Sequence, residues 1–250
     1  MKDFTVVITS SNRFDLLKQT VLSLSKYLDK QPREYIIIED SDNSGIFELV
    51  EQLDLPIKVI FNEQRMGQIK SIDKAYQAVK TPYVFHCEDD WEFIRTGFIE
   101  ESMQILNTFP QASMVGLRAR DQLNPRVRKM PEKVLNNIHY FDLDPSLHPE
   151  YFSYSFNPGL RRHKDYLKLA PLESLGHEED ISYHFKQLGF YIANLELPAV
   201  KHIGDERHVN DPNFKPRAKT FFSKLQRSFK KRIKRIKRFI KNQLNDGRSV

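Results

Sequence analysis

Short apolar segments alternate with segments of helical hydrophobic spacing through the first 117 residues, and this alternation constrains the fold most. Residues 4–9 form a β-branched run that is typical of a buried strand. Further strands are expected at 35–38, 57–61, 82–87 and 112–117, and helices at 13–28, 46–53, 66–79 and 94–109. Strands and helices that alternate with short connections predict an α/β fold, in which helices flank a mostly parallel sheet.

The pattern weakens after residue 117. Residues 118–176 are rich in charged, proline and aromatic residues, which predicts an irregular region over one edge of the sheet, suited to recognition of a substrate. A helix is expected at 178–188, a last strand at 190–193 and a loop at 199–208. We therefore interpret residues 1–213 as one domain.

The charge is unevenly distributed along the 250 residues. The formal net charge is +6, but residues 214–250 hold 14 of the 39 Lys and Arg residues and one of the 33 acids, which gives +13 there and −7 elsewhere. Apolar residues of this tail recur every three or four positions, at Phe222, Leu225, Phe229, Ile233, Ile236, Ile240 and Leu244. An apolar stripe opposite a basic face predicts an amphipathic helix that lies in the plane of an anionic membrane.

Three alternatives for this tail remain open. The stripe could pack on the domain, the segment could be disordered in isolation, or the basic face could bind nucleic acid. The last alternative makes the chain a nucleic-acid-binding module that acts through its basic tail.

Composition and missing motifs exclude several classes of protein. The single cysteine, Cys87, excludes a disulfide framework and a Cys-based zinc cluster, and is expected inside a strand. No apolar run reaches the ~18–20 residues of a membrane span, and no signal-peptide pattern precedes the first strand. We therefore expect a cytoplasmic protein, peripheral on the cytoplasmic face of the membrane. The chain has no G-x-G pair and no P-loop motif, which disfavours dinucleotide-binding enzymes and P-loop NTPases.

Polar clusters follow three of the expected strands, at residues 10–13, 39–44 and 88–90. Ligands of such sheets bind beyond the carboxyl ends of the strands. The third cluster is Glu88, Asp89 and Asp90, whose hard oxygen atoms suit a divalent metal that neutralises phosphate. A solvated acidic turn is the alternative interpretation, and Asp90 is also placed to cap the turn that follows.

Five motifs occur in a fixed order: TSSNR at 9–13, EDSDNS at 39–44, NEQRMG at 62–67, EDD at 88–90 and GHEEDISYHFKQLG at 176–189. Together they resemble the nucleotide-sugar-dependent glycosyltransferases of the GT-A fold, most closely glycosyltransferase family 2, over residues 4–208. The resemblance implies a Rossmann-like domain that moves a sugar from a nucleotide-sugar, with UDP favoured, to a hydroxyl of a glycan or lipid-linked glycan. It also implies inversion at the sugar and a role in surface polysaccharide or glycoconjugate synthesis.

The resemblance assigns roles to the matching side chains. Asp90 is the implied ligand of Mn²⁺ or Mg²⁺ and His202 a further ligand, with His208 as the weaker candidate and a solvated loop histidine as the alternative. Glu39 or Asp40 would accept a hydrogen bond from N3 of uracil. The implied contacts of the nucleotide-sugar are Thr9, Ser11, Arg13, Glu39, Asp40, Asn62, Arg65, Gly67, Glu88 and Asp89.

Acceptor activation needs a carboxylate that takes the proton of the attacking hydroxyl. Asp180 matches the family's general base, and its neighbours Glu178 and Glu179 have competing claims, with Glu179 the second candidate. Acids in the first turn of a helix also stabilise it without any catalytic role. Trp91 could contact a sugar ring, and packing in the core is the alternative for it.

Overall fold

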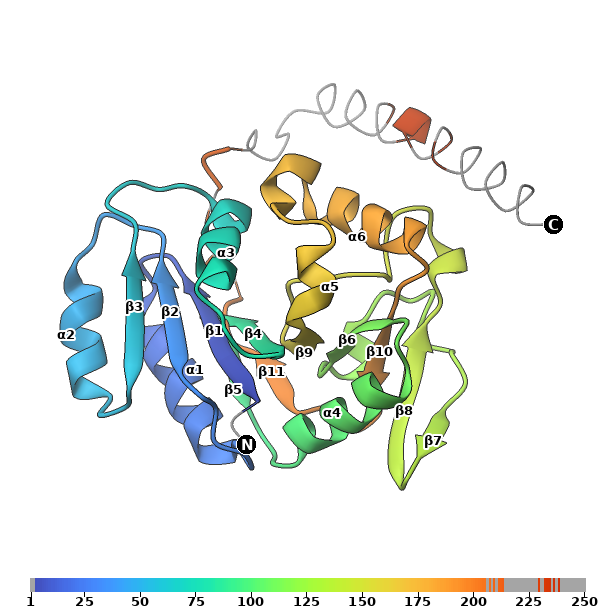
Figure 1. Cartoon of the computed structure of the whole chain (residues 1–250), viewed down its shortest axis with the longest axis horizontal. Coiled ribbons are helices and arrows are strands. Elements are labelled where there is room, and N and C mark those ends of the chain that lie inside the picture. Colours follow the sequence, from blue (N-terminus) through green and yellow to red (C-terminus); the bar gives the residue numbers. More distant parts are fainter. Residues whose placement is uncertain are drawn as a thin grey trace.

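The computed structural model describes residues 3–205, 207, 209, 211–213, 229, 232–234, 236 and 238. A nine-stranded sheet crosses the molecule, in the order β3-β2-β1-β4-β9-β6-β10-β8-β7, and helices cover both of its faces (Figure 1). The α/β fold with a mostly parallel sheet, predicted from the alternation, is confirmed.

Four parallel strands build the half of the sheet that comes first in the chain. The central strand β1 is buried along all seven of its residues, which explains its continuous apolar sequence. It pairs with β2 on one side and with β4 on the other. The elements of this half are β1 (Phe4–Ser10), α1 (Phe14–Tyr27), β2 (Tyr35–Glu39), α2 (Gly45–Gln52), β3 (Ile57–Phe61), α3 (Gln68–Gln77) and β4 (Tyr83–Glu88).

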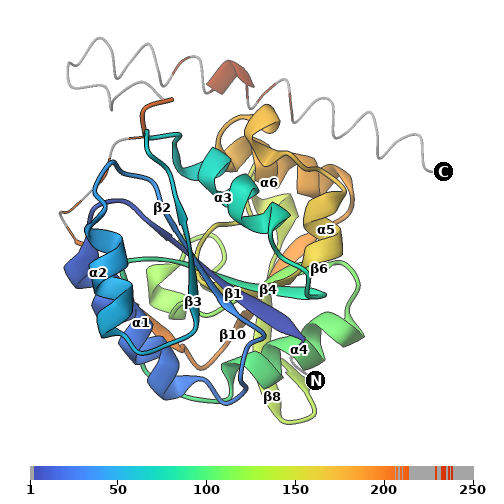
Figure 2. The same ribbon diagram turned by 60° about the vertical axis from the view of Figure 1, so that its left-hand side comes forward.

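Alternate residues of the strands point to two separate hydrophobic clusters. Val6 and Ile8 of β1 pack with α1, α2 and α4 (Phe98–Thr108) on one face of the sheet. Val7 packs on the other face with α3, α5 (His163–Leu167) and α6 (Glu178–Gln187) (Figure 2). Both faces are therefore covered, and ligands reach the sheet from its ends.

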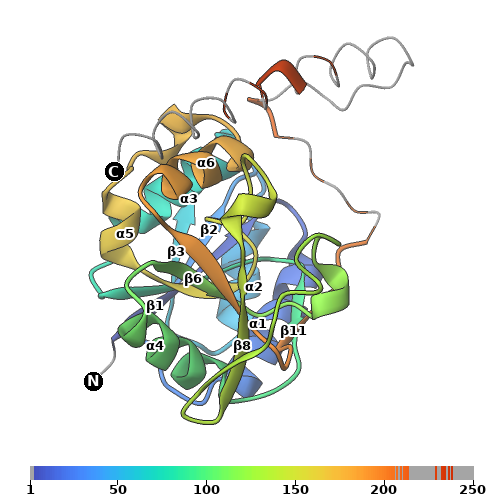
Figure 3. The ribbon, with the colours of Figure 1, turned by 90° about the vertical axis from the view of Figure 1, so that its right-hand side faces the viewer.

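The region 118–176 is more regular than its sequence indicates. It supplies β9 (Gly159–Arg162), which is inserted antiparallel between β4 and β6 (Ala112–Gly116). It also supplies β7 (Lys133–Leu135) and β8 (Ile138–Leu143), which extend the sheet beyond β10 (Tyr191–Leu195) (Figure 3). The short helical turns here are η1 (Arg120–Gln122), η2 (Pro145–Leu147) and η3 (Leu172–Leu175).

A second, two-stranded sheet lies beside the first. β5 (Trp91–Phe93) pairs antiparallel with β11 (Val200–His202), so part of the loop expected at 199–208 is a strand. This ribbon places His202 opposite Trp91. A search of the described residues for a helix long and apolar enough to cross a bilayer finds none.

Candidate functional site

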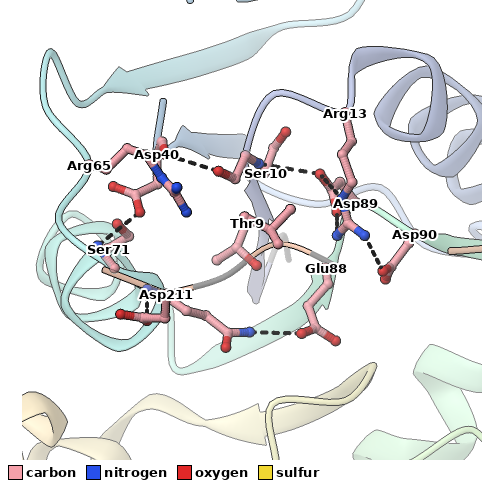
Figure 4. A pocket seen from close by; sticks show the side chains of 14 residues that line it. Thr9, Ser10, Arg13, Asp40, Arg65, Ser71, Glu88, Asp89, Asp90 and Asp211 are labelled. Carbon is pink, nitrogen blue, oxygen red and sulfur yellow. Dashed lines mark hydrogen bonds and ion pairs between the residues drawn. The ribbon is translucent and has the colours of Figure 1, made fainter. Parts of the chain in front are cut away.

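A cavity opens beyond the carboxyl ends of β1, β2 and β4 (Figure 4). It gathers residues from all three polar clusters that follow these strands. Nine predicted residues line it, namely Thr9, Ser11, Arg13, Asp40, Arg65, Gly67, Glu88, Asp89 and Asp90. Five further lining residues were not predicted, namely Ser10, Gln68, Ser71, Val209 and Asp211.

Asp40 fixes the turn that forms one wall of this cavity. Its carboxylate accepts hydrogen bonds from the backbone N–H groups of Met66 and Gly67, at 2.7 and 2.9 Å, and from Asn62 Nδ2 at 3.1 Å. Gly67 has φ +92°, a conformation that glycine adopts without strain. The turn therefore has a defined shape before any ligand binds.

Glu39 and Asn62 lie behind the cavity wall and are not among the residues that line it. The Glu39 carboxylate is buried and accepts hydrogen bonds from the Asn12 N–H, at 2.8 Å, and from the Ser41 hydroxyl. Of the two acids that the resemblance implied for uracil, Asp40 is the one that reaches the cavity. We interpret Glu39 and Asn62 as supports of the loops that form the wall.

Arg13 neutralises the acids that follow β4. Its guanidinium bonds to the carboxylate of Asp89 and, at 2.8 Å, to Asp90 Oδ2. Burial raises the pKa of Asp89 to about 6, although the charge of Arg13 opposes that shift. Arg13 thus offsets part of the cost of concentrating carboxylates at one point.

Glu88 is held differently, because no cation bonds to it directly among the described residues. Gln68 Nε2 donates to it at 2.7 Å and Trp91 Nε1 at 3.3 Å. Burial, with repulsion from Asp90 and Glu178, raises the pKa of Glu88 to about 8.

The ribbon of β5 and β11 brings His202 to Asp90. His202 Nε2 lies 3.5 Å from Asp90 Oδ2, and its Nδ1 lies 3.0 Å from Asp205 Oδ1. The backbone N–H of Ile203 donates to the Asp90 carbonyl at 2.9 Å. A Cβ on Gly204 would lie 2.5 Å from Asp90 Oδ2, so this close approach requires glycine.

The donor set at this point fits Mn²⁺ or Mg²⁺. Asp90 Oδ1 is buried and has no hydrogen-bond partner among the described residues. A carboxylate oxygen and an imidazole nitrogen suit Mn²⁺, and the carboxylate bonded to the second nitrogen of His202 fixes the orientation of the ring. The part of the chain that the structure describes contains no group of three or more such side chains, so a bound ligand or water would supply the other ligands. His208 lies outside the described residues.

Trp91 supports the site from behind. It is 2% exposed, its ring lies 4.9 Å from the His202 ring, and Arg118 lies 5.5 Å from its ring centre. It is not among the residues that line the cavity. This placement favours core packing over contact with a sugar.

A second cavity lies next to the first, between the ends of β6 and β10 and the region 118–158. Its lining includes Arg118, Tyr151, Asn157 and Glu178. Glu178 Oε1 accepts a hydrogen bond from the Ser155 hydroxyl at 2.8 Å. Burial raises the pKa of Glu178, and the proximity of its charge to Glu88 links the two cavities. The acid that faces this space is therefore Glu178.

Asp180 and Glu179 have other surroundings. Asp180 Oδ2 accepts a hydrogen bond from the His177 N–H at 3.1 Å, which closes a capping interaction at the start of α6. Burial by itself would raise the pKa of Asp180, but the bonds from Lys234 and Arg238 outweigh burial and hold this pKa below its usual range. Glu179 Oε2 lies 3.5 Å from the Tyr151 hydroxyl. The catalytic roles of Asp180 and Glu179 remain predictions.

Comparison with known families and structures agrees with this geometry. The model of the family described as glycosyl transferase family 2 matches residues 5–168. No curated protein matches the chain.

Several solved structures share the fold. The mannosyltransferase PcManGT from Pyrobaculum calidifontis, solved with GDP-Man and Mn²⁺, has a TM-score of 0.58 at 12% identity, over 82% of this chain and 58% of that one. GalNAc-T7, solved with UDP, GalNAc and Mn²⁺, has a TM-score of 0.56 at 17% identity, over 80% and 42%. TarS 1–349 from S. aureus has a TM-score of 0.56 at 18% identity, over 80% and 59%. The chain thus spans less than two thirds of each of these proteins.

Proposed function

The chain belongs to glycosyl transferase family 2, and we propose that it transfers a sugar, with inversion and with a divalent metal, from a nucleotide-sugar to an acceptor hydroxyl. The observation that carries the proposal is a pair of cavities whose acids lie close enough for Glu88 of the first and Glu178 of the second to repel each other. Asp40 and Asp90 line the first cavity, His202 contacts Asp90 from outside the lining, and Glu178 lines the second cavity. A donor in the first cavity would thus present its sugar toward the base in the second.

The first cavity suits the nucleotide and diphosphate. Asp40 offers an acceptor for the N3–H of uracil, and Arg65, on the turn that Asp40 fixes, supplies a positive charge beside it (Figure 4). A divalent ion held by Asp90 and His202 would supply positive charge to the leaving diphosphate. We propose a UDP-sugar as the donor, and the relatives solved with UDP or GDP-Man support a nucleoside diphosphate of this kind.

Glu178 is the general base in this proposal. Its carboxylate takes the proton of the acceptor hydroxyl while the oxygen bonds to the anomeric carbon. The bond from that carbon to the diphosphate breaks at the same time, and the diphosphate leaves with the electron pair. One displacement from the face opposite the leaving group inverts the sugar. A raised pKa improves Glu178 as a base relative to an ordinary carboxylate.

The acceptor is a glycan or lipid-linked glycan, bound along the second cavity. Aromatic side chains such as Tyr151 and polar ones such as Asn157 line this space, as suits the apolar and hydroxyl faces of a sugar. The basic tail at 214–250 would hold the enzyme at the cytoplasmic face of an anionic membrane. Such a position suits the synthesis of a surface polysaccharide or another glycoconjugate.

Thermal unfolding with a panel of nucleotides tests the donor and the metal together. We expect a UDP-sugar with Mn²⁺ to raise the melting temperature more than either ligand alone, because each binds the native state. Asp90→Asn and His202→Ala should remove the effect of Mn²⁺. Asp54→Asn should preserve it, because Asp54 is an exposed acid between α2 and β3 that does not line the cavity. A protein that responds to no nucleoside diphosphate would contradict the proposal.

A further inference from the structure

The described C-terminal residues touch the domain through basic side chains. Arg238 Nη1 lies 2.7 Å from Glu150 Oε1, and its Nη2 bonds to Asp180. Its guanidinium also lies 4.3 Å from the centre of the Tyr183 ring. Lys234, four positions earlier on the same helical face, bonds to Asp180 as well. We call these contacts the clamp.

The contacts of Arg238 in the clamp are shielded from water on both sides, whereas the Lys234 side chain is 38% exposed. The side chains of Arg238, Glu150 and Asp180 are 15%, 3% and 9% exposed. Exposed ion pairs contribute little, but removing one partner of a shielded pair leaves an uncompensated charge. The clamp is therefore expected to persist in solution at ordinary salt concentrations.

Apolar side chains of the same segment point to solvent. Phe229, Ile233 and Ile236 are 64%, 41% and 60% exposed. Their spacing of four and three positions places them on one helical face, away from Lys234 and Arg238. The apolar stripe of the tail is thus free of the domain at these three residues.

The clamp also lies beside the second cavity. Asp180 follows Glu178 by two residues in α6, and Glu150 directly precedes Tyr151 of the cavity lining. In Figure 1 the described C-terminal residues lie above α6, on the side of the molecule that holds this helix. A surface that binds the stripe would therefore come close to the acceptor cavity.

We propose that Phe229, Ile233 and Ile236 form a docking face for an anionic lipid bilayer, and that the clamp keeps this face attached to the domain during docking. The occupant is a bilayer because three exposed apolar residues stand within a segment of net charge +13 at 214–250. Membrane binding then orients the enzyme, with its acceptor cavity beside the lipid surface. The inference rests on the proposed function, because it assigns that cavity to the acceptor.

Flotation with phosphatidylcholine vesicles, with and without phosphatidylglycerol, tests the docking face. We expect the full chain to float with the anionic vesicles, and Ile233→Ser with Ile236→Ser to lower the partition coefficient about tenfold or more. Leu22→Ser is the matched control, because Leu22 is 50% exposed on α1, and it should change the coefficient less than twofold. Unchanged binding of the double variant, or binding to a single-stranded RNA in preference to the vesicles, would overturn the proposal.

A second pair of variants tests the clamp. Lys234→Ala with Arg238→Ala should lower vesicle binding less than twofold, because the domain and not the lipid holds these two charges. Lys224→Ala with Arg227→Ala removes the same charge elsewhere in the tail and should cost about fivefold per residue. An equal loss of vesicle binding in the two double variants would show that Lys234 and Arg238 bind lipid instead of the domain.

Hydrogen exchange of the wild-type chain gives an independent measurement of the clamp. Amides around residues 150 and 180 should stay at least as protected on anionic vesicles as in solution, and faster exchange there would overturn the clamp. Vesicle binding requires no sugar donor. If the chain binds UDP with Mn²⁺ but does not bind vesicles, this inference is contradicted and the proposed function stands.

Discussion

Glu178, Glu179 and Asp180 are adjacent acids with three different surroundings. Glu178 lines the second cavity and accepts a hydrogen bond from Ser155, whereas Asp180 caps α6 and bonds to Lys234 and Arg238. A base must be both accessible to the acceptor and ready to accept a proton. Strong pairing with two cations makes Asp180 a weaker base, while burial makes Glu178 a stronger one.

Replacement of Glu178 by glutamine should remove most of the activity. The amide keeps the size of the side chain and its acceptor for Ser155, but it takes no proton, so we expect kcat/KM to fall about 10²–10⁴-fold. Asp180→Asn is the matched control and should retain activity within about tenfold, although it weakens the cap by ~1 kcal/mol and removes the charge that pairs with Lys234 and Arg238. The steady-state rate of nucleoside diphosphate release measures both variants. The reverse ranking would return the role of base to Asp180.

As the pH rises, activity should increase while the free energy of unfolding decreases. Glu178 must be ionised to act, so activity rises with pH through a pKa above the ordinary value of 4.5. A raised pKa in the native state means that the folded chain binds more protons, so its contribution to stability is lost as pH rises through that pKa. Glu178→Gln should therefore match the wild type near pH 4 and be the more stable protein at pH 8. Urea denaturation at the two pH values would reveal this, and a variant less stable at pH 8 would contradict it.

Sequence reasoning found the acids and, through the family resemblance, placed Asp180 first and Glu179 second as the base, which stays a prediction. Four of the five acids that line the first cavity stand at or directly after the end of a strand, a position readable from the hydrophobic pattern, whereas Asp211 does not. The orientation of Glu178 depends on the packing of α6 against the loop at 154–157, which no local pattern reports. One signal was available, because His177 and Asp180 have the spacing of a helix cap.

The ribbon of β5 and β11 shows why short elements escape prediction. Each strand has three residues, too few for a period of two to be recognised. β9 is not predicted for another reason. Arg161 and Arg162 are charged residues in a buried strand in the middle of the sheet, where the sequence pattern leads one to expect apolar residues. Their guanidinium groups bond to backbone carbonyls such as those of Ser155 and Pro110, and this compensation is visible only in three dimensions.

Gly204→Ala should weaken metal binding through the same ribbon. Its Cβ would lie 2.5 Å from Asp90 Oδ2 and 2.6 Å from Asp90 Cβ, so the carboxylate must move away from His202. Displacing the support of a ligand typically lowers metal affinity about 10–100-fold. Titration of Mn²⁺ followed by electron paramagnetic resonance measures the change.

Gly189→Ala is the control for a general effect of glycine replacement. Gly189 has φ +78° and no atom within 4 Å of an added Cβ, so this variant adds backbone strain without touching the site. It should lose ~1–2 kcal/mol of stability and keep the wild-type affinity for Mn²⁺. Equal loss of Mn²⁺ affinity in both variants would mean that the ribbon does not position Asp90.

The average charge of the chain describes neither of its parts. The first 213 residues carry −7 and collect acids around the cavities, while the remaining residues carry +13. The composition predicted this division, but not the contact between Arg238 and Asp180 that joins the two parts. Much of the tail lies outside the described residues, so the amphipathic helix expected at 214–250 stays a prediction there.

Removal of the divalent metal should weaken the binding of UDP to the domain. Repulsion among Glu88, Asp89 and Asp90 is offset in part by Arg13 and by the hydrogen bonds that Gln68 and Trp91 donate to Glu88, so we expect the metal-free chain to remain folded. A ligand present at a hundred times its Kd stabilises the native state by about 2.7 kcal/mol, which is ~5–11 °C in melting temperature for a domain of this size. UDP should produce such a shift with Mn²⁺ and only a small one with EDTA. Because binding linkage is reciprocal, UDP must tighten Mn²⁺ by the same factor. Equal shifts by UDP with Mn²⁺ and with EDTA would place the metal away from the diphosphate, and Asp90 and His202 would then need another role.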